Sequence, residues 1–253
     1  MNSQSQSASL DSRIAGLRVL YEDNHIIAVN KATADLVQGD KTGDDTLADV
    51  VKGYLRQENA KKGNVFLGVA HRLDRPVSGV VLFARTSKAL ERLSQMFREG
   101  TVRKTYWALV QERPPKEADT LVHFLRRNPK LNKSFAVSQN ASGAKQSELR
   151  YRLLVSLDRY HLLEVELLTG RHHQIRAQLS AIGCHIKGDL KYGAPRSNAD
   201  GGISLHARRV SFTHPVRDTE LTITADPPVD PLWNAALEKL GLQRQQQTEA
   251  PRS

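Results

Sequence analysis

The sequence predicts an α+β domain with a mostly antiparallel mixed sheet and flanking helices. Short strand-like runs outnumber helical segments, and the helices fall between them without the regular alternation of a doubly wound sheet. No internal repeat and no linker rich in glycine or serine divides the chain. We therefore expect one domain over residues 16–242, between a disordered polar leader (1–15) and a disordered tail (243–253).

The first elements expected are a hairpin and a helix. Two apolar runs in 17–32 are separated by the turn-prone sequence EDNH, which predicts the hairpin. Apolar residues then recur at helical spacing in 46–57. Thr46 and Asp49 fit a capping box, so this helix is expected to begin there.

The next segment pairs two strands around a turn. Strands are expected at 64–73 and 79–86, on either side of the sequence DRPVS. Its proline lacks a backbone donor, so Asp74 is expected on an exposed loop. The apolar stripe of 87–100 predicts an amphipathic helix that ends at Gly100.

The second half of the chain is expected to add most of the sheet. The polar, basic segment 126–146 has little periodicity and is expected to protrude as a hairpin or loop. The stretch HHQIRAQLSAIG (172–183) predicts a helix with one apolar face. Strands are expected at 102–111, 147–157, 160–170, 203–215 and 220–228, followed by a closing helix at 230–242.

The charge of the chain favours a polyanionic partner. Lys and Arg total 37 against 27 Asp and Glu, a formal charge of +10, and nucleic acid is the first candidate. The alternative is that this charge only aids solubility. The single cysteine, Cys184, fits a reducing cytoplasm. No apolar run has the length of a signal or membrane helix, so no membrane association is expected.

One carboxylate and two arginines are the candidates for chemistry. Asp74 lies in HRLDRPVSG, and Arg171 and Arg176 lie in TGRHHQIR. Arg176, if it lies beside Asp74, would keep the carboxylate ionised. If a helix includes both arginines, Arg171 is five positions from Arg176 and would point elsewhere, for example to a phosphate. The alternative is a simple buried ion pair.

Other familiar sites are not supported. The sequence has no P-loop and no dinucleotide-binding glycine motif. Cys184 and His185 are adjacent and rarely face each other, so a nucleophilic cysteine is not expected. His172 and His173 should point apart on a helix without an acid or cysteine nearby, so no metal site is expected.

Four segments, taken in order, resemble the RluA-type family of RNA pseudouridine synthases: LYEDNHIIAVNKA, HRLDRPVSG, KTYWALV and LLTGRHHQIRAQLSAIGCHIKGDLKYG. The likeness covers about residues 17–228 and implies the pseudouridine synthase fold with a central cleft. Val77 and Ala32 depart from the Thr and Pro that family members often have. No small RNA-binding module is expected before the first strand, so specificity would come from the domain's own surface, such as 126–145.

The resemblance implies roles for individual residues. Asp74 would act on the sugar of a flipped uridine, Tyr106 would stack on the base, and Arg176 would hold Asp74. Arg72 would fill the space that the base vacates, and Leu168 would line the base pocket. Periodicity alone would place Tyr106 in the core. Arg171, Lys104 and His71 are further expected RNA contacts.

The resemblance also implies the reaction and its requirements. A uridine in structured RNA would be isomerised, with ribosomal RNA expected ahead of transfer RNA. No cofactor or metal is expected, because the reaction exchanges a C–N for a C–C glycosidic bond without redox change. We expect a monomer. The alternative is a catalytically silent RNA-binding assembly factor or chaperone of the same fold, although an ionised acid in a phosphate-binding groove would weaken such binding.

Overall fold

The computed structural model describes residues 10–39, 45–59 and 65–241. Its strands are β1 (Val19–Glu22), β2 (Ile26–Lys31), β3 (Gly68–Val69), β4 (Ser78–Ala84), β5 (Arg103–Val110), β6 (Ala118–Asn128), β7 (Lys133–Val137), β8 (Lys145–Ser156), β9 (His161–Leu167), β10 (Leu205–Thr213) and β11 (Glu220–Thr224). Its helices are α2 (Leu47–Asn59), α3 (Ser87–Glu99), α4 (Gln174–Ala181), α5 (Pro231–Lys239) and the 3-10 helix η1 (Leu190–Tyr192).

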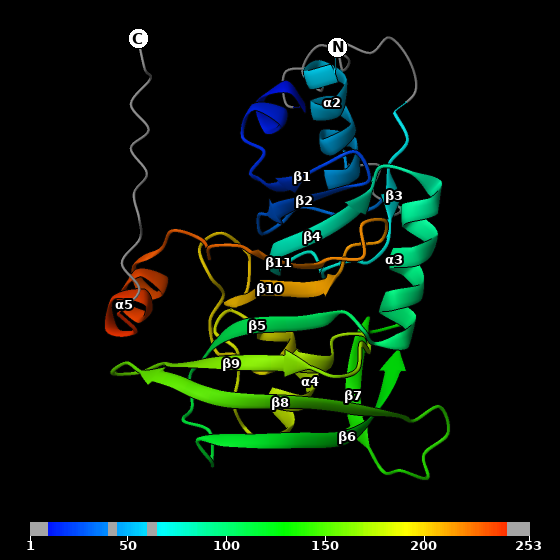
Figure 1. The fold of residues 1–253 in the computed structure, drawn as a ribbon. Coiled ribbons are helices and arrows are strands. Elements are labelled where there is room, and N and C mark those ends of the chain that lie inside the picture. Colours follow the sequence, from blue (N-terminus) through cyan, green and yellow to red (C-terminus); the bar gives the residue numbers. More distant parts are fainter. Residues whose placement is uncertain (1–9, 40–44, 60–64, 242–253) are drawn as a thin grey trace.

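All eleven strands belong to one twisted sheet (Figure 1). The main order is β1-β2-β4-β10-β5-β9-β8-β6-β7, with β3 beside β4 and β11 beside β10. Within the described strands, β4 and β10 pair in parallel and every other pair is antiparallel. The predicted α+β class, with a mostly antiparallel mixed sheet, is therefore confirmed.

The two faces of the sheet carry separate cores, because successive side chains of a strand point to opposite sides. On β4, Val81 and Phe83 join the large core that includes residues of α2 and α4. Val80 and Leu82 face the other way and pack with α3. At the far end of that second face, Trp107 of β5 packs with Trp233 of α5. Figure 1 shows α3 and α5 at opposite ends of the sheet and α4 behind it.

Local signals in the sequence predicted several elements correctly. The hairpin of 17–32 is β1 and β2. The capping box at the start of α2 is present: the Thr46 N–H donates to Asp49 Oδ2 at 3.1 Å, and the Asp49 N–H donates to Thr46 Oγ1 at 3.2 Å. Gly100 ends α3 in the left-handed conformation. Segment 126–146 includes the hairpin of β6 and β7.

Other boundaries differ from the expectation. Residues 10–15, expected in a disordered leader, are helical, and Ile14 is buried. The expected strand 64–73 is paired only at β3, after which the chain leaves the sheet as a loop. Residues 1–9 and 242–253, which include the expected tail, lie outside the described residues. In the described part of the chain, no helix is long and apolar enough to cross a membrane.

Candidate active site

Asp74 lies on the loop between β3 and β4, and the buried Lys31 holds this loop by hydrogen bonds to its backbone. The turn is closed by the Val77 N–H, which donates to the Asp74 carbonyl at 3.0 Å. Lys31 Nζ donates to the carbonyls of Arg75 (3.0 Å) and Val77 (2.7 Å). Burial lowers the pKa of Lys31 to about 8. The backbone on both sides of the turn is thus fixed, which limits the positions that Asp74 can take.

The family departures at Val77 and Ala32 leave this loop intact. Val77 packs its side chain into the large core, and its N–H and carbonyl both form hydrogen bonds with protein groups. The Ala32 carbonyl accepts a further bond from Lys31 Nζ at 2.9 Å. A hydroxyl at position 77 is therefore not needed to hold the turn. Gly79 follows at φ +117°, where a Cβ would lie 2.3 Å from the carbonyl oxygen of Ala207.

Arg176 lies beside Asp74, as the sequence led us to expect. Its Nη1 is 3.3 Å from Asp74 Oδ2, while its Nε and Nη2 lie 2.6 and 2.8 Å from the two oxygens of Asp189. The Arg176 side chain is 5 % exposed and that of Asp74 is 32 % exposed. Arg176 is therefore fixed by Asp189 within the protein, and it presents its third nitrogen to a carboxylate that solvent can reach.

A cavity of about 300 Å³ opens at Asp74. Its walls include six of the expected site residues besides Asp74: His71, Arg72, Lys104, Tyr106, Arg171 and Arg176. Leu168 is absent from this lining, and Leu167 is present instead. The expectation for Leu168 is therefore corrected by one position: Leu167 is the last residue of β9, and Leu168 lies in the bend that follows it.

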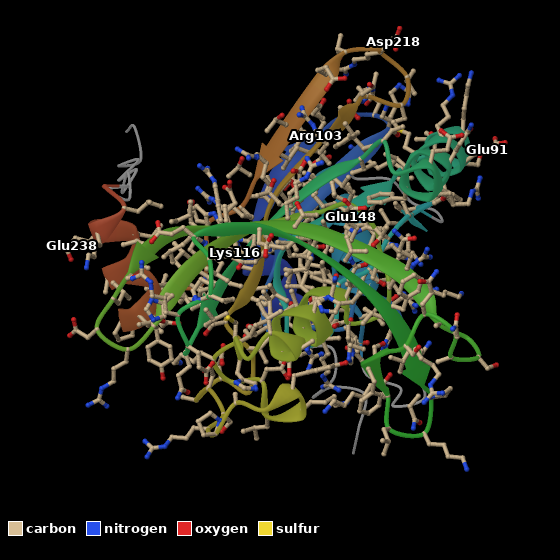
Figure 2. The ribbon with its side chains drawn as sticks, turned by 90° about the horizontal axis from the view of Figure 1, so that it is seen from below. Glu91, Arg103, Lys116, Glu148, Asp218 and Glu238 are labelled. Carbon is tan, nitrogen blue, oxygen red and sulfur yellow. The ribbon has the colours of Figure 1, made fainter. Side chains whose placement is uncertain are left out.

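The alternation of β5 separates Tyr106 from Trp107. Lys104 and Tyr106 line the cavity, whereas Trp107 belongs to the core beneath α5. Arg103, labelled in Figure 2, lies on the side of the sheet away from α4. Burial, and secondly the charge of Asp74, raise the pKa of Tyr106 far above its usual value. Tyr106 is therefore a protonated phenol at neutral pH, with its ring at the cavity.

His71 forms part of the cavity wall, and its imidazole is neutral. Its Nε2 accepts the Leu82 N–H at 2.9 Å, and its ring stacks on Phe97 with centroids 4.5 Å apart. Burial, and then the charge of Lys104, lower the pKa of His71 to about 3. His71 therefore cannot serve as a cationic RNA contact near neutral pH, because Nε2 is already engaged and the ring carries no charge.

A wider groove of about 710 Å³ meets the cavity at Asp74 and Arg176. It carries cations from four separate parts of the chain: Arg72 and Arg75, Arg127, Arg171, and Lys191. Arg171 precedes α4 and its Nε donates to the Gln146 carbonyl at 3.2 Å, so the expectation that it lies on a helix is wrong. Backbone phosphates are the chemistry that such a cationic groove fits.

The two adjacent histidines also differ from the expectation. They do not point apart, because α4 begins only at Gln174 and His173 has a left-handed backbone with φ 53°. Their rings stack with centroids 3.8 Å apart. His173 Nε2 lies 3.4 Å from Asp74 Oδ2.

The described residues contain no group of three or more His, Cys, Asp or Glu that could hold a metal ion.

Two residues of the site, Asp189 and Tyr192, were not singled out from the sequence, and His173 was considered only as a metal ligand. Asp189 pairs with Arg176, and the Tyr192 ring lies 4.9 Å from the Arg176 guanidinium. Asp189 and Tyr192 fall in GDLKYG, the end of the long segment that carries the resemblance. That motif was the only available signal, since spacing alone does not show that η1 returns to α4.

Comparison with known families decides the family of the chain. The family model for RNA pseudouridylate synthase matches residues 25–181, more than half of the chain. The chain belongs to the RluA-type family of RNA pseudouridine synthases. It is therefore an RNA-modifying isomerase, and the expected family is confirmed. The matched region includes Asp74, Tyr106 and Arg176.

Named relatives of the synthase modify different RNAs. It is 32 % identical over 237 residues to a ribosomal large subunit pseudouridine synthase C of Vibrio cholerae, covering 90 % of this chain and 71 % of the relative. It is 33 % identical over 243 residues to a tRNA pseudouridine synthase C of Salmonella typhimurium, covering 89 % and 90 %. The solved structure of human RNA pseudouridylate synthase domain containing 4 shares the fold, with a TM-score of 0.73, 22 % identity, and coverage of 94 % and 97 %.

Proposed function

We propose that this synthase isomerises a specific uridine of structured RNA at Asp74. The observation that carries the proposal is the position of this carboxylate, where a small cavity meets a cationic groove. The groove suits the backbone phosphates on either side of the target, and the cavity suits a single pyrimidine nucleoside. Asp74 then stands at the point where the ribose of that nucleoside would lie.

The target uridine must leave its stack to enter the cavity. Extruding a base costs a few kcal/mol, so a group that occupies the vacated space would stabilise the extruded state. Arg72 is exposed, precedes Asp74 by two positions and lines both the cavity and the groove. We assign this task to Arg72, and we assign the phosphate contacts to the remaining cations of the groove.

The reaction breaks the bond between N1 and C1′, turns the uracil, and forms a bond between C5 and C1′. The proton on C5 leaves, and N1 gains one, so atoms and charge balance without any oxidant or reductant. Asp74 either attacks C1′ or removes a proton from the sugar to give a glycal. Tyr106 presents its ring to the base, and its protonated hydroxyl is suited to pass a proton rather than to remove one as a phenolate.

The RNA substrate is proposed at the level of its class. Ribosomal RNA was the first expectation, and the named relatives include enzymes for ribosomal RNA and for transfer RNA. Both kinds of RNA therefore enter the test. We further propose that the synthase works as a monomer, without metal or small-molecule cofactor. The buried free thiol of Cys184 is consistent with a cytoplasmic location.

Carbodiimide modification followed by primer extension tests the proposal on both substrates. Unmodified ribosomal RNA and transfer RNA transcripts are incubated with the wild-type synthase or with Asp74→Asn. We expect a pseudouridine stop at one or a few positions with the wild type and none with Asp74→Asn. Stops of equal intensity with the variant would remove Asp74 from the mechanism. An absence of stops with the wild type on both RNAs would contradict the proposed substrate class.

A further inference from the structure

Two donors approach the same oxygen of Asp74. Arg176 Nη1 lies 3.3 Å and His173 Nε2 lies 3.4 Å from Oδ2. Neither of these two donors engages the other oxygen, Oδ1. Such contacts are often long in a free enzyme and shorten when substrate is bound. The arrangement therefore leaves one carboxylate oxygen available to the ribose while the other is held by the protein.

The proton on His173 can be placed from the partners of its second ring nitrogen. His173 Nδ1 lies 3.0 Å from the Tyr192 hydroxyl oxygen, and that oxygen accepts the Ser134 N–H at 2.8 Å. Because the tyrosine oxygen already accepts a bond, its own hydrogen is free to point at Nδ1. Nδ1 is then an acceptor. With the tyrosine hydrogen in that direction, the proton of a neutral imidazole lies on Nε2, which faces Asp74.

The surroundings keep this imidazole neutral. Burial comes first, followed by the charges of Arg176, His172 and Lys191, and together they lower the pKa of His173 to about 2. His173 is 8 % exposed, and Ser134 and Tyr192 are also buried. In a cationic His173, Nδ1 would become a donor, so the hydrogen bond with Tyr192 would have to reverse its direction.

The backbone of His173 is unusual for a residue with a side chain. It precedes the first residue of α4 in a left-handed conformation, φ 53° and ψ 28°. Residues at this position often cap the helix with their side chains, but the His173 side chain forms no cap bond. Its ring stacks on His172 and reaches Asp74 and Tyr192 instead. A strained backbone at a site is a reason to look for such a role.

We propose that His173 is a positioning residue for Asp74, with its proton held on Nε2 by the chain Ser134–Tyr192–His173. The neutral Nε2–H donates to Oδ2 and, with Arg176, fixes the rotation of the carboxylate so that Oδ1 faces the sugar. Ser134 belongs to β7, in the hairpin that contributes Arg127 to the groove. The carboxylate is thereby connected to the RNA-facing hairpin by two hydrogen bonds and the 3.4 Å approach of His173 Nε2 to Oδ2. The catalytic part of this inference rests on the proposed function.

The first test reads the proton directly in the free protein, without RNA. In protein labelled with ¹⁵N-histidine, one of the nine imidazoles is assigned to residue 173 by its disappearance in His173→Gln. We expect its Nε2 to carry hydrogen and its Nδ1 to be unprotonated. In Tyr192→Phe, which removes only the hydroxyl, we expect a mixture of the two tautomers. A protonated Nδ1 in the wild type, or an unchanged spectrum in Tyr192→Phe, would overturn the inference.

The second test compares two amides at position 173 in single-turnover reactions with RNA. The glutamine nitrogen can take the place of Nε2 and keep the bond to Asp74, whereas the shorter asparagine reaches only the place of Nδ1. We expect His173→Asn to slow turnover about tenfold, the value of one lost hydrogen bond, and His173→Gln to recover most of the rate. RNA affinity should stay within about twofold in both. His161→Asn, on β9 and remote from the site, is the matched control and should not change the rate.

Equal rates for His173→Asn and the wild type, or equal losses for the two amides, would overturn the positioning role. Urea unfolding of each variant shows whether a loss of rate follows a loss of stability. If His173→Asn does not fold, Tyr192→Phe keeps the prediction testable, because it should slow turnover without affecting RNA affinity. The spectrum of the free protein stands by itself if the wild type proves inactive on the RNA offered, so failure of the inference and failure of the proposed function can be told apart.

Discussion

Arg176 and Asp189 form a buried bidentate pair, with Nε–Oδ2 at 2.6 Å and Nη2–Oδ1 at 2.8 Å. Their side chains are 5 % and 1 % exposed. The pair fixes the plane of the guanidinium, and Nη1 is the nitrogen that remains for Asp74. In the proposed reaction Asp189 would act through Arg176, since Asp189 itself does not line the cavity.

Removing the charge of Asp189 should destabilise the fold. In Asp189→Asn the Arg176 cation stays buried, and Asp74 is the only carboxylate among the described residues that is left paired with it. Removing one partner of a buried ion pair lowers the free energy of unfolding by about 3–5 kcal/mol. Urea unfolding followed by circular dichroism measures the loss. A double variant, Arg176→Met with Asp189→Leu, should recover much of the stability because it leaves no buried charge. It should still be inactive, because Asp74 has lost its guanidinium partner. Full activity of the double variant would contradict the role assigned to Arg176.

Stability should depend on pH through His71. The folded-state pKa, about 3, is below the value of about 6.5 for an unfolded chain, so the unfolded chain takes up the proton first as pH falls. The contribution of neutral His71 is fully present above pH 6.5 and is lost as pH falls towards 3. Relative to His71→Gln, the wild type should lose about 1.4 kcal/mol per pH unit between pH 6 and 4. Parallel unfolding free energies for the two proteins over this range would contradict the assignment.

The sequence predicted those parts of the fold that depend on neighbouring residues. The hairpin of β1 and β2, the capping box of Thr46 and Asp49, and the end of α3 at Gly100 follow from turn and cap chemistry within a few positions. The opposite directions of Tyr106 and Trp107 follow from the two-residue repeat of a strand. These features need no knowledge of the tertiary fold.

The remaining features depend on contacts between distant segments. Arg176 pairs with Asp189 because the segment before η1 folds back against α4. The spacing of the two residues in the sequence does not predict this contact. The start of α4 was predicted two residues early, because His173 has a left-handed backbone, which helix propensity does not reveal. Lys31 is another residue whose position could not be predicted from the sequence. A lysine in a strand is usually expected to be exposed, but Lys31 is only 1 % exposed and lies beneath the Asp74 loop.

Arg72 should matter more for turnover than for affinity. If it stabilises the extruded nucleotide, Arg72→Ala should slow the single-turnover rate at saturating RNA by at least tenfold, since extrusion costs a few kcal/mol. The dissociation constant should change by less than about threefold. Filter binding and rapid-quench measurements supply the two values. Arg159→Ala, in the turn between β8 and β9, removes the same charge elsewhere and should change neither. Equal losses of rate and affinity would instead mark Arg72 as a phosphate contact.

The groove should account for much of the salt dependence of RNA binding. Each phosphate contact that is removed lowers the slope of log K against log salt by about 0.7–0.9. Arg127→Ala and Lys191→Ala should each reduce the slope by roughly this amount, because both cations line the groove beside Asp74. Arg159→Ala provides the comparison, with an unchanged slope. Unaltered slopes for both groove variants would place the RNA backbone on another surface.

The role of Asp74 is tested most directly by the release of tritium from RNA labelled at C5 of uridine, measured under single-turnover conditions with the wild type and Asp74→Asn. Isomerisation must expel the hydrogen from C5, so release counts the reaction itself and is independent of how tightly RNA is bound. We predict complete release at the target site with the wild type. With Asp74→Asn we predict none above background, while the affinity for the same RNA stays within several-fold. Release at the wild-type rate from the variant would contradict the assignment of Asp74 as the catalytic carboxylate.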